Sequence, residues 1–184
     1  EGDLPADLGR YVLALGRVVP KKGFDLLIRG FAQVAARHPD VTLAISGDGP
    51  SLGDLRSLAD ELAIHDRVRF LGRLSRSQVA SAMASAEVFV MPSRVEPFGI
   101  VLLEAWRDGR AVIATSKGGP PEFVDEGRTG LLVNPFDTLA LGQALDRLLA
   151  DPQLRDEIGR AAQERVRDFS WPVIADQYQD LYRA

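Results

Sequence analysis

Short apolar runs alternate with amphipathic segments along nearly the whole chain. The runs are apolar at consecutive positions, which is typical of strands buried on both faces of a sheet. They predict six strands, at residues 11–15, 41–45, 68–71, 88–91, 111–114 and 130–133. Between the runs, apolar residues recur at spacings of three and four, which predicts amphipathic helices; the first of these positions are Phe24, Leu27, Ile28, Phe31 and Val34.

Capping residues mark several of the predicted helices. Ser75 and Gln78 fit a capping box before a helix that runs to about residue 85. Asp137 is expected to cap another helix, and Asp151 with Pro152 has the pattern of an N-cap followed by proline at the first helical position. Further helices are expected at about 52–63 and 98–107, and a last one is expected to open at 170–172.

This alternation of strands and helices predicts the fold class. Parallel strands need crossover connections, and the connecting helices cover both faces of the sheet. We therefore expect a single α/β domain over residues 1–184, a doubly wound Rossmann-like three-layer αβα sandwich with a mainly parallel six-stranded sheet. If the strand order is 3-2-1-4-5-6, ligands should bind beyond the carboxyl ends of strands one and four, where the order reverses.

Composition and charge exclude several functions. The chain has 184 residues, of which 46% are hydrophobic and 26% charged, so it is neither disordered nor a membrane span. Lys and Arg number 22 against 26 Asp and Glu, and the resulting net charge of −4 disfavours a general nucleic-acid binder. No Cys is present and there are two His, which excludes thiol nucleophiles and leaves too few residues for a His-rich metal site.

The loop after the first strand is a candidate anion site. Residues 16–23 contain two glycines and three cations just before a helix. Backbone amides and the helix dipole favour an anion there, and Arg17 and Lys22 can pair with phosphate oxygens. The loop matches neither the dinucleotide fingerprint nor a P-loop, so a solvated basic turn remains the alternative.

The loop after the fourth strand combines a carboxylate with another helix start. Glu96 is suited to accept hydrogen bonds from hydroxyl groups, and the amides of residues 98–100 would be free at a helix N-terminus. Glu104 follows in a helix that is apolar nearly all round, so we expect it to be buried and to need partners such as sugar hydroxyls. A structural role is the alternative for both carboxylates.

Two other loops give weaker signals. Gly72, Arg73 and Leu74 follow the third strand and either border a nucleotide base or form a plain turn. Gly118 and Gly119 follow the fifth strand, where paired glycines allow a close approach of the backbone to a ligand. A structural turn is the favoured interpretation of the paired glycines.

Together these segments resemble one enzyme family. Residues 96–104 have the E-x7-E signature of retaining glycosyltransferases of family 4, the glycosyl transferases group 1, which have the GT-B fold. Other matching segments occur in the family's order and spacing: Gly16-Arg17 with Lys22-Gly23, Gly47-Asp48-Gly49-Pro50, Phe70-Leu71-Gly72, Met91-Pro92-Ser93, Gly118-Gly119 with Glu122, and Gly130-Leu131-Leu132-Val133. The resemblance covers about residues 11–182 and implies the C-terminal, donor-binding half of such an enzyme, which fits a chain that starts with Glu rather than Met.

The resemblance also implies roles for the matching residues. The diphosphate of the donor would be bound next to Gly16 by Arg17 and Lys22, and the base would be bordered by Arg73 and Leu74, largely through backbone. Hydroxyls of the donor sugar would be held by Glu96, and those of the ribose by Glu104. Sugar and phosphate would also be contacted by the amides of Phe98, Gly99 and Ile100. The residues expected to act in catalysis are Glu96, Arg17 and Lys22.

The implied reaction is transfer of a hexose with retention at the anomeric carbon, from a UDP-, GDP- or ADP-linked sugar, in glycan biosynthesis. The family's mechanism is front-face attack, with the leaving phosphate helping to deprotonate the acceptor. No cofactor or metal is expected, because Arg17 and Lys22 supply the cationic charge.

The expected partners follow from the same resemblance. They are an N-terminal Rossmann half, without which the chain would be inactive, and an acceptor that is a sugar, a lipid or a small molecule; nucleic acid is not among them. The expected location is the cytoplasm, with a peripheral position of the full-length protein at the inner face of the membrane as the alternative.

Other functions remain open. A stand-alone nucleotide-sugar binding module that catalyses nothing would show the same loops. A GT-B phosphorylase that uses inorganic phosphate is less favoured, since the E-x7-E signature with Arg17 and Lys22 favours a nucleotide donor. A receiver protein would need an acidic cluster after the first strand, where this chain has cations.

Overall fold

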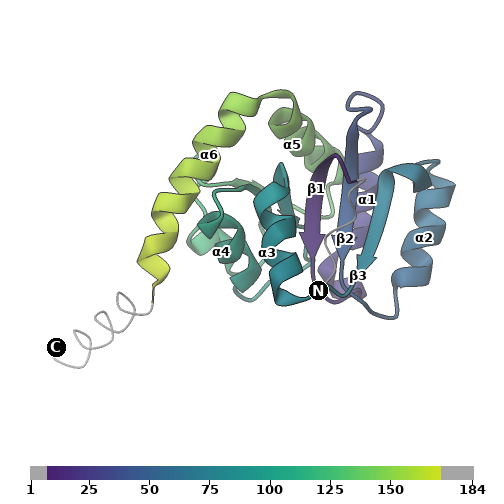
Figure 1. Ribbon diagram of the computed structural model, residues 1–184, viewed down its shortest axis with the longest axis horizontal. Coiled ribbons are helices and arrows are strands. Elements are labelled where there is room, and N and C mark those ends of the chain that lie inside the picture. Colours follow the sequence, from purple (N-terminus) through teal and green to yellow (C-terminus); the bar gives the residue numbers. More distant parts are fainter. Residues whose placement is uncertain (1–7, 171–184) are drawn as a thin grey trace.

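A computed structural model describes residues 8–170 as a parallel sheet between two layers of helices (Figure 1). The sheet order is β3-β2-β1-β4-β5-β6, and every neighbouring pair is parallel. The predicted fold class is therefore confirmed, and the strand order is the one under which ligands were expected beyond strands one and four. The strands are β1 (Arg10–Leu15), β2 (Val41–Ser46), β3 (Val68–Gly72), β4 (Val88–Met91), β5 (Ala111–Thr115) and β6 (Leu131–Val133).

The helices lie close to the expected positions. They are α1 (Phe24–Ala32), α2 (Leu52–Glu61), α3 (Arg76–Ser85), α4 (Ile100–Arg107), α5 (Thr138–Ala150) and α6 (Pro152–Arg165). Three of the expected N-caps form: Ser75 and Gln78 make the capping box, Asp137 accepts from the amide of Ala140, and Asp151 accepts from that of Leu154. The last helix was expected to open at residues 170–172, and beyond Ser170 it lies outside the described residues.

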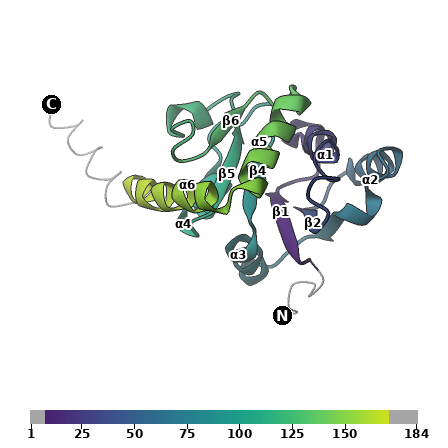
Figure 2. The same ribbon diagram turned by 90° about the horizontal axis from the view of Figure 1, so that it is seen from above.

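The core is divided by the sheet into two layers. Alternate residues of each strand enter opposite layers, so that Val12 and Ala14 of β1 pack on one side and Tyr11 and Leu13 on the other. The first layer contains α1, α2 and α5, and the second contains α3 and α4 (Figure 2). Helix α6 packs against β5 and α4. Because both faces are covered, the strands are apolar at consecutive positions, as their sequences predicted.

Helix α4 differs from expectation in two ways. It begins at Ile100 rather than at about residue 98, because Gly99 has a left-handed backbone with φ 94°, which a helix cannot include. It is also not buried all round: Leu102, Ala105 and Trp106 enter the core, whereas Ile100 is 69% exposed. The first turn of α4 is therefore open to solvent at Ile100.

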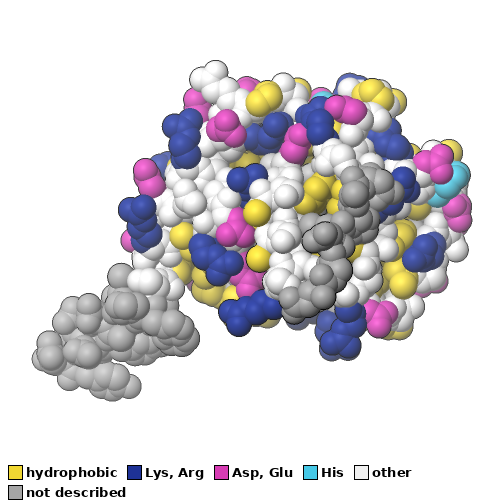
Figure 3. All heavy atoms as spheres, in the orientation of Figure 1, with side chains coloured by type: hydrophobic (Ala, Val, Ile, Leu, Met, Phe, Trp, Pro, Cys, Tyr) yellow, Lys and Arg dark blue, Asp and Glu magenta, His cyan; other side chains and the backbone are white. Residues whose placement is uncertain are grey.

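Acidic and basic side chains are mixed on the molecular surface. Figure 3 shows them interspersed over the face drawn there, with no broad area of one sign. Among residues 8–170 no helix is long and apolar enough to cross a membrane.

Candidate functional site

The candidate site lies where the loops after β1, β2, β3 and β4 meet, at the carboxyl edge of the sheet. The strand order reverses here, because β1 pairs with β2 on one side and with β4 on the other. In an open parallel sheet this is the position at which ligands bind. The loops after β1 and β4 are the two that the sequence singled out.

Glycines allow these loops to touch each other. A Cβ atom on Gly23 would lie 2.0 Å from the carbonyl oxygen of Pro92, and one on Gly47 would lie 1.8 Å from that of Gly16. Gly23 also has φ 67°, in the left-handed region. Side chains at these positions would force the β1, β2 and β4 loops apart. The glycines therefore allow the three loops to lie in direct backbone contact at the site.

The paired glycines after β5 have the same structural use. A Cβ atom on Gly118 would lie 2.1 Å from the carbonyl oxygen of Glu96, and one on Gly119 would lie 2.3 Å from that of Pro97. The amide of Gly119 donates to Glu96 at 2.9 Å, and the amide of Glu96 donates to Lys117 at 3.0 Å. The paired glycines thus allow the β5 loop to approach the backbone that carries Glu96. This is a structural use, which is the interpretation that the sequence favoured.

Arg94 holds the β1 and β4 loops together through its side chain and its backbone. Its guanidinium donates to both carboxylate oxygens of Asp25, at 2.8 and 2.7 Å, and its amide donates to the carbonyl of Lys21 at 2.9 Å. Partial burial opposes the charged form of Asp25, but the bonds and charge of Arg94 outweigh it and hold the pKa of Asp25 below its usual value. Asp25 in turn raises the pKa of Arg94. The pair therefore fixes Lys22, which follows Lys21, relative to the β4 loop.

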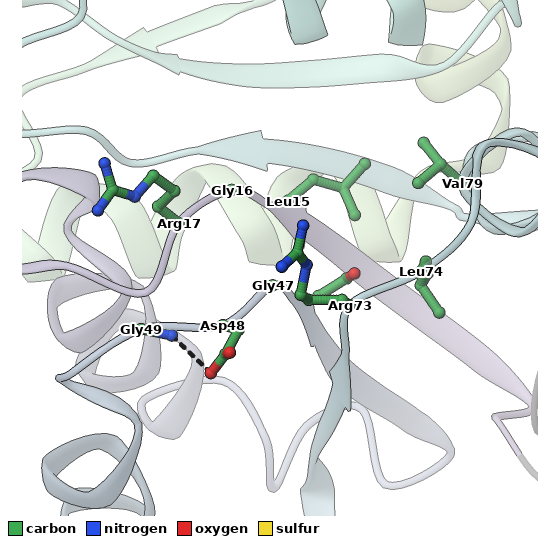
Figure 4. Close-up of a pocket in the computed structure, with 10 residues that line it drawn as sticks. Leu15, Gly16, Arg17, Gly47, Asp48, Gly49, Arg73, Leu74 and Val79 are labelled. Atoms are coloured by element: carbon green, nitrogen blue, oxygen red, sulfur yellow. Dashed lines mark hydrogen bonds between the residues drawn. The ribbon is translucent and has the colours of Figure 1, made fainter.

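One cavity of about 510 Å³ opens beside the first loop (Figure 4). Figure 4 shows Arg17 at one end of it and Leu74 and Val79 at the other. Its walls come from the ends of β1, β2 and β3, and it is lined by Leu15, Gly16, Arg17, Ser46, Gly47, Asp48, Gly49, Arg73, Leu74 and Val79. Four of the ten residues predicted for the site, Gly16, Arg17, Arg73 and Leu74, are in this set.

A second cavity of about 520 Å³ adjoins the first and shares Leu15, Gly16 and Val79 with it. It lies between the β1 loop and the start of α4, and its other lining residues are Lys22, Glu96, Pro97, Phe98, Gly99, Ile100, Val101 and Glu104. Six predicted residues besides Gly16 are in this set. The two cavities together therefore contain all ten residues predicted for the site.

Lys22 and Glu96 form an ion pair within the second cavity. The ammonium of Lys22 lies 2.7 Å from Oε2 of Glu96, and the hydroxyl of Ser93 donates to the same oxygen at 3.0 Å. Glu96 is buried, at 8% exposure, and Ser93 is fully buried. The pair brings together residues 74 positions apart, so a cation and an acceptor share one wall of the cavity.

The other charged residues of the site are more open. We expected Glu104 to be buried, and this is wrong: it is half-buried, because its side of α4 faces the cavity rather than the core. Arg17 and Arg73 are exposed, and no ion pair links either of them to another residue between 8 and 170. Both guanidinium groups are therefore available to an anion.

Sequence reasoning missed several residues of the site. Leu15 and Ser46 are the last residues of β1 and β2, and Asp48 lies in a segment expected to be only a turn. The rule that ligands bind at strand carboxyl ends would have found them. Ser93 lies in the β4 loop and in the family-matching segment Met91-Pro92-Ser93, but no role was assigned to its side chain. It lines neither cavity, and its hydroxyl donates to Glu96. Within the described range, no group of three or more His, Asp or Glu side chains is placed to hold a metal ion.

Comparisons of its sequence and structure with known proteins match this chain to glycosyltransferases. The family model of the glycosyl transferases group 1 matches residues 5–165. The chain is 38% identical over 188 residues to the GDP-mannose-dependent alpha-(1-6)-phosphatidylinositol monomannoside mannosyltransferase of Mycolicibacterium smegmatis, a match that covers 98% of this chain and 48% of that protein. It spans about half the length of the curated relatives it matches.

Two solved structures are similar to it. HepE of Anabaena in complex with UDP-glucose superposes with a TM-score of 0.85 at 28% identity, over 95% of this chain and 49% of that one. The C-terminal domain of the glycosyl transferase group 1 protein LpcC of Francisella tularensis superposes with a TM-score of 0.79 at 26% identity, over 86% and 85% of the two chains. The second match covers most of a C-terminal domain.

Proposed function

The chain belongs to the glycosyl transferases group 1 family, and on that basis we propose that it is the donor-binding half of a retaining glycosyltransferase. The observation that carries the proposal is the pair of adjoining cavities, which together hold every residue expected to contact a nucleotide sugar. The proposed domain comprises the whole chain, residues 1–184.

The first cavity is suited to the base of the nucleotide. It is lined by Leu15, Leu74 and Val79, which offer apolar surface to a base, and by the exposed guanidinium of Arg73. Glu104 in the adjoining cavity has a half-buried carboxylate that can accept from two ribose hydroxyls. The base and the ribose would thus lie on either side of Val79, which lines both cavities.

The diphosphate would lie at the junction of the two cavities. Gly16 lines both of them, with Arg17 in the first and Lys22 in the second. A diphosphate crossing the junction would therefore pass between two cations and face the N-terminus of α4, which attracts negative charge. The sugar would then lie beside Glu96.

The proposed reaction replaces one bond at the anomeric carbon by another on the same face of the sugar. The bond from this carbon to the diphosphate breaks, the acceptor oxygen bonds to it, and the acceptor proton passes to the leaving phosphate. Arg17 and Lys22 would stabilise the charge that develops on the leaving group, which is the role a metal ion plays elsewhere. Glu96 would hold sugar hydroxyls so that the face under attack stays accessible.

The solved structures and relatives support more than one donor. HepE forms a complex with UDP-glucose, whereas the Mycolicibacterium mannosyltransferase depends on GDP-mannose. We propose a UDP-, GDP- or ADP-linked hexose, no metal requirement, and an acceptor that is bound by a separate N-terminal half. We further propose that the full protein works in the cytoplasm, at the inner face of the membrane if its acceptor is a lipid.

Thermal unfolding of this chain with UDP, GDP, ADP and their sugars tests the proposal. Ligand at 100 times its Kd adds about 2.7 kcal/mol to the free energy of unfolding. For a chain of this size, that raises Tm by about 5–10 °C. We expect such a shift with one base, and its loss in Lys22→Ala and Glu104→Ala.

Arg128→Ala is the matched control, because Arg128 is an exposed residue that lines neither cavity. This variant should keep the full shift. The absence of any shift at millimolar concentrations of all three nucleotides would contradict donor binding by this chain.

A further inference from the structure

Ser93 is a buried polar side chain that the proposed site does not use. It lies in the β4 loop, is completely buried, and lines neither cavity. Its hydroxyl donates to Oε2 of Glu96 at 3.0 Å. A hydroxyl that is removed from solvent and directed at a cavity carboxylate is suited to orienting that carboxylate, since it cannot reach a ligand itself.

The backbone of Glu96 is already fixed, which leaves the carboxylate as the part that needs orienting. The amide of Glu96 donates to Lys117 and its carbonyl accepts from Gly119, at 3.0 and 2.9 Å. The plane of the carboxylate could still turn about the last side-chain bond, since this torsion is broad. Donors held to one oxygen fix the plane of the carboxylate, and with it the direction in which the other oxygen can accept a hydrogen bond.

Two donors hold the same oxygen of Glu96. Lys22 lies 2.7 Å from Oε2 and Ser93 lies 3.0 Å from it. No hydrogen bond from residues 8–170 is assigned to Oε1, which leaves this oxygen able to accept from a ligand in the second cavity.

Lys22 and Ser93 differ in whether they have a second role in the proposed site. Lys22 is a long, flexible side chain, 28% exposed, and in the proposed function its charge also serves the diphosphate. Ser93 is short, fully buried and only three residues from Glu96 in the same loop. Its bond can persist unchanged while Lys22 turns to a phosphate.

We propose that Ser93 is a positioning residue that holds Oε2 of Glu96, so that Oε1 is presented to a hydroxyl of the donor sugar. This inference rests on the proposed function, because it requires that the sugar occupy the second cavity. It predicts that Ser93 contributes to binding of the sugar and not to binding of the nucleotide.

Titration calorimetry of this chain separates the two contributions. The Kd values of UDP, GDP and ADP are compared with those of their hexose conjugates, and the ratio within the pair that binds measures the sugar contact. In Ser93→Ala we expect the conjugate to bind about tenfold more weakly, because hydrogen bonds to charged groups are among the stronger ones. The Kd of the nucleoside diphosphate should change less than about twofold, since the nucleotide does not touch Glu96.

A double-mutant cycle identifies the route of the effect. If Ser93 acts only through Glu96, then adding Ser93→Ala to Glu96→Ala should weaken binding of the conjugate no further. Ser93→Cys keeps the branching of the side chain but replaces the hydroxyl by a larger group that is a weak donor, and it should behave as Ser93→Ala does. It serves as the second variant if the alanine variant fails to fold.

Thr129→Val is the matched control. Thr129 is also buried, and its hydroxyl accepts from the amide of Asp125 at 2.9 Å, away from both cavities. This variant should lower Tm without changing the ratio of the two Kd values.

Three results would overturn the inference. Equal weakening of the nucleotide and its conjugate by Ser93→Ala would show a general structural role. A further loss in the Glu96→Ala background would show that Ser93 does not act through Glu96. Equal affinity of the original chain for nucleotide and conjugate would show that this pocket does not sense the sugar, whereas binding of neither would overturn the proposed function itself.

Discussion

At the scale of the residue, the two lysines of the β1 loop show how position decides chemistry. Lys21 and Lys22 are adjacent and identical in charge, but Lys21 is exposed and Lys22 is paired with Glu96 inside the second cavity. An anion in the cavities would meet one ammonium and not the other. Both the loop argument and the family resemblance named Lys22 and not Lys21, and Lys22 lines the second cavity.

This difference gives a paired prediction. Lys22→Ala should weaken nucleoside-diphosphate binding by about tenfold or more, because a charge-assisted contact to phosphate is worth about 1.5–3 kcal/mol. Lys21→Ala removes the same charge from the surface and should weaken binding by less than about threefold at physiological salt. Titration calorimetry measures both variants, and equal losses would indicate that only the net charge of the loop matters.

Asp25 gives a pH-dependent prediction at the same scale. Its pKa in the folded chain lies below the usual 3.8, because Arg94 outweighs the cost of burial. A lowered pKa stabilises the fold above the unfolded pKa, and this contribution is lost as the pH falls below about 4. Urea unfolding should therefore show Asp25→Asn to be about 1–2 kcal/mol less stable at pH 7, with the difference shrinking towards about pH 3. A constant difference across this range would contradict the role given to the pair.

At the scale of the element, the loops at the carboxyl edge are held together by backbone contacts that only glycine allows. Gly23 ends the 3-10 turn η1 (Pro20–Lys22) and begins α1 with a left-handed backbone, while its Cα faces the carbonyl of Pro92. The turn that carries Lys22 and the loop that carries Glu96 can therefore approach each other. The hydrogen bonds between Arg94 and Asp25 join the β4 loop to the start of α1, next to this contact.

Gly23→Ala should separate these elements. A Cβ atom at 2.0 Å from the Pro92 oxygen cannot be accommodated without moving backbone, and the positive φ adds strain. We expect a loss of about 3 kcal/mol or more in stability, together with weaker nucleotide binding. Chemical denaturation measures the first effect and calorimetry the second.

Gly53→Ala is the opposite case. Gly53 lies in α2, has no atom within 4 Å of its Cβ position and has no positive φ. Replacement by Ala should stabilise the chain by about 0.5–1 kcal/mol through helix propensity. Destabilisation at both positions would mean that the close contact is not what makes Gly23 necessary.

At the scale of the whole molecule, the site is open at the carboxyl edge of the sheet. The exposed side chains of Val95, Phe98 and Ile100 stand beside Glu96, and the chain spans about half the length of its curated relatives. Transfer needs an acceptor placed against the sugar and protected from water. The two cavities contain the residues proposed to bind the donor, and none of their residues is assigned to an acceptor.

We therefore predict that this chain binds nucleotide sugar but performs no multiple-turnover transfer. Addition of the N-terminal half that is proposed to bind the acceptor should restore transfer. The anomeric configuration of the product, measured by NMR, should then match that of the donor. Sustained transfer by the chain alone would contradict the first expectation. An inverted product would contradict the retaining mechanism.

Much of the fold follows from local patterns, as particular elements show. The capping box at Ser75 and the caps at Asp137 and Asp151 form as predicted, because a cap depends on residues three positions apart. The strands were recognisable because burial on both faces requires continuous apolar runs. The alternation of strand and helix then left few possible topologies, and the observed order is the one on which the expected ligand position depended.

The sequence by itself singled out the loops after β1 and β4, because parallel strands bring their carboxyl ends to one edge. The family resemblance supplied the ten residues expected at the candidate site, but neither assigned Ser46 or Val79 to it. Tertiary structure decided how those residues meet. It placed Gly118 and Gly119 against the backbone of Glu96 and Pro97, left Glu104 half-buried on the cavity side of α4, and put Ser93 and Lys22 on one oxygen of Glu96. These contacts join side chains and loops from separate elements, so they depend on the path of each loop through space, which no local pattern of polar and apolar residues encodes.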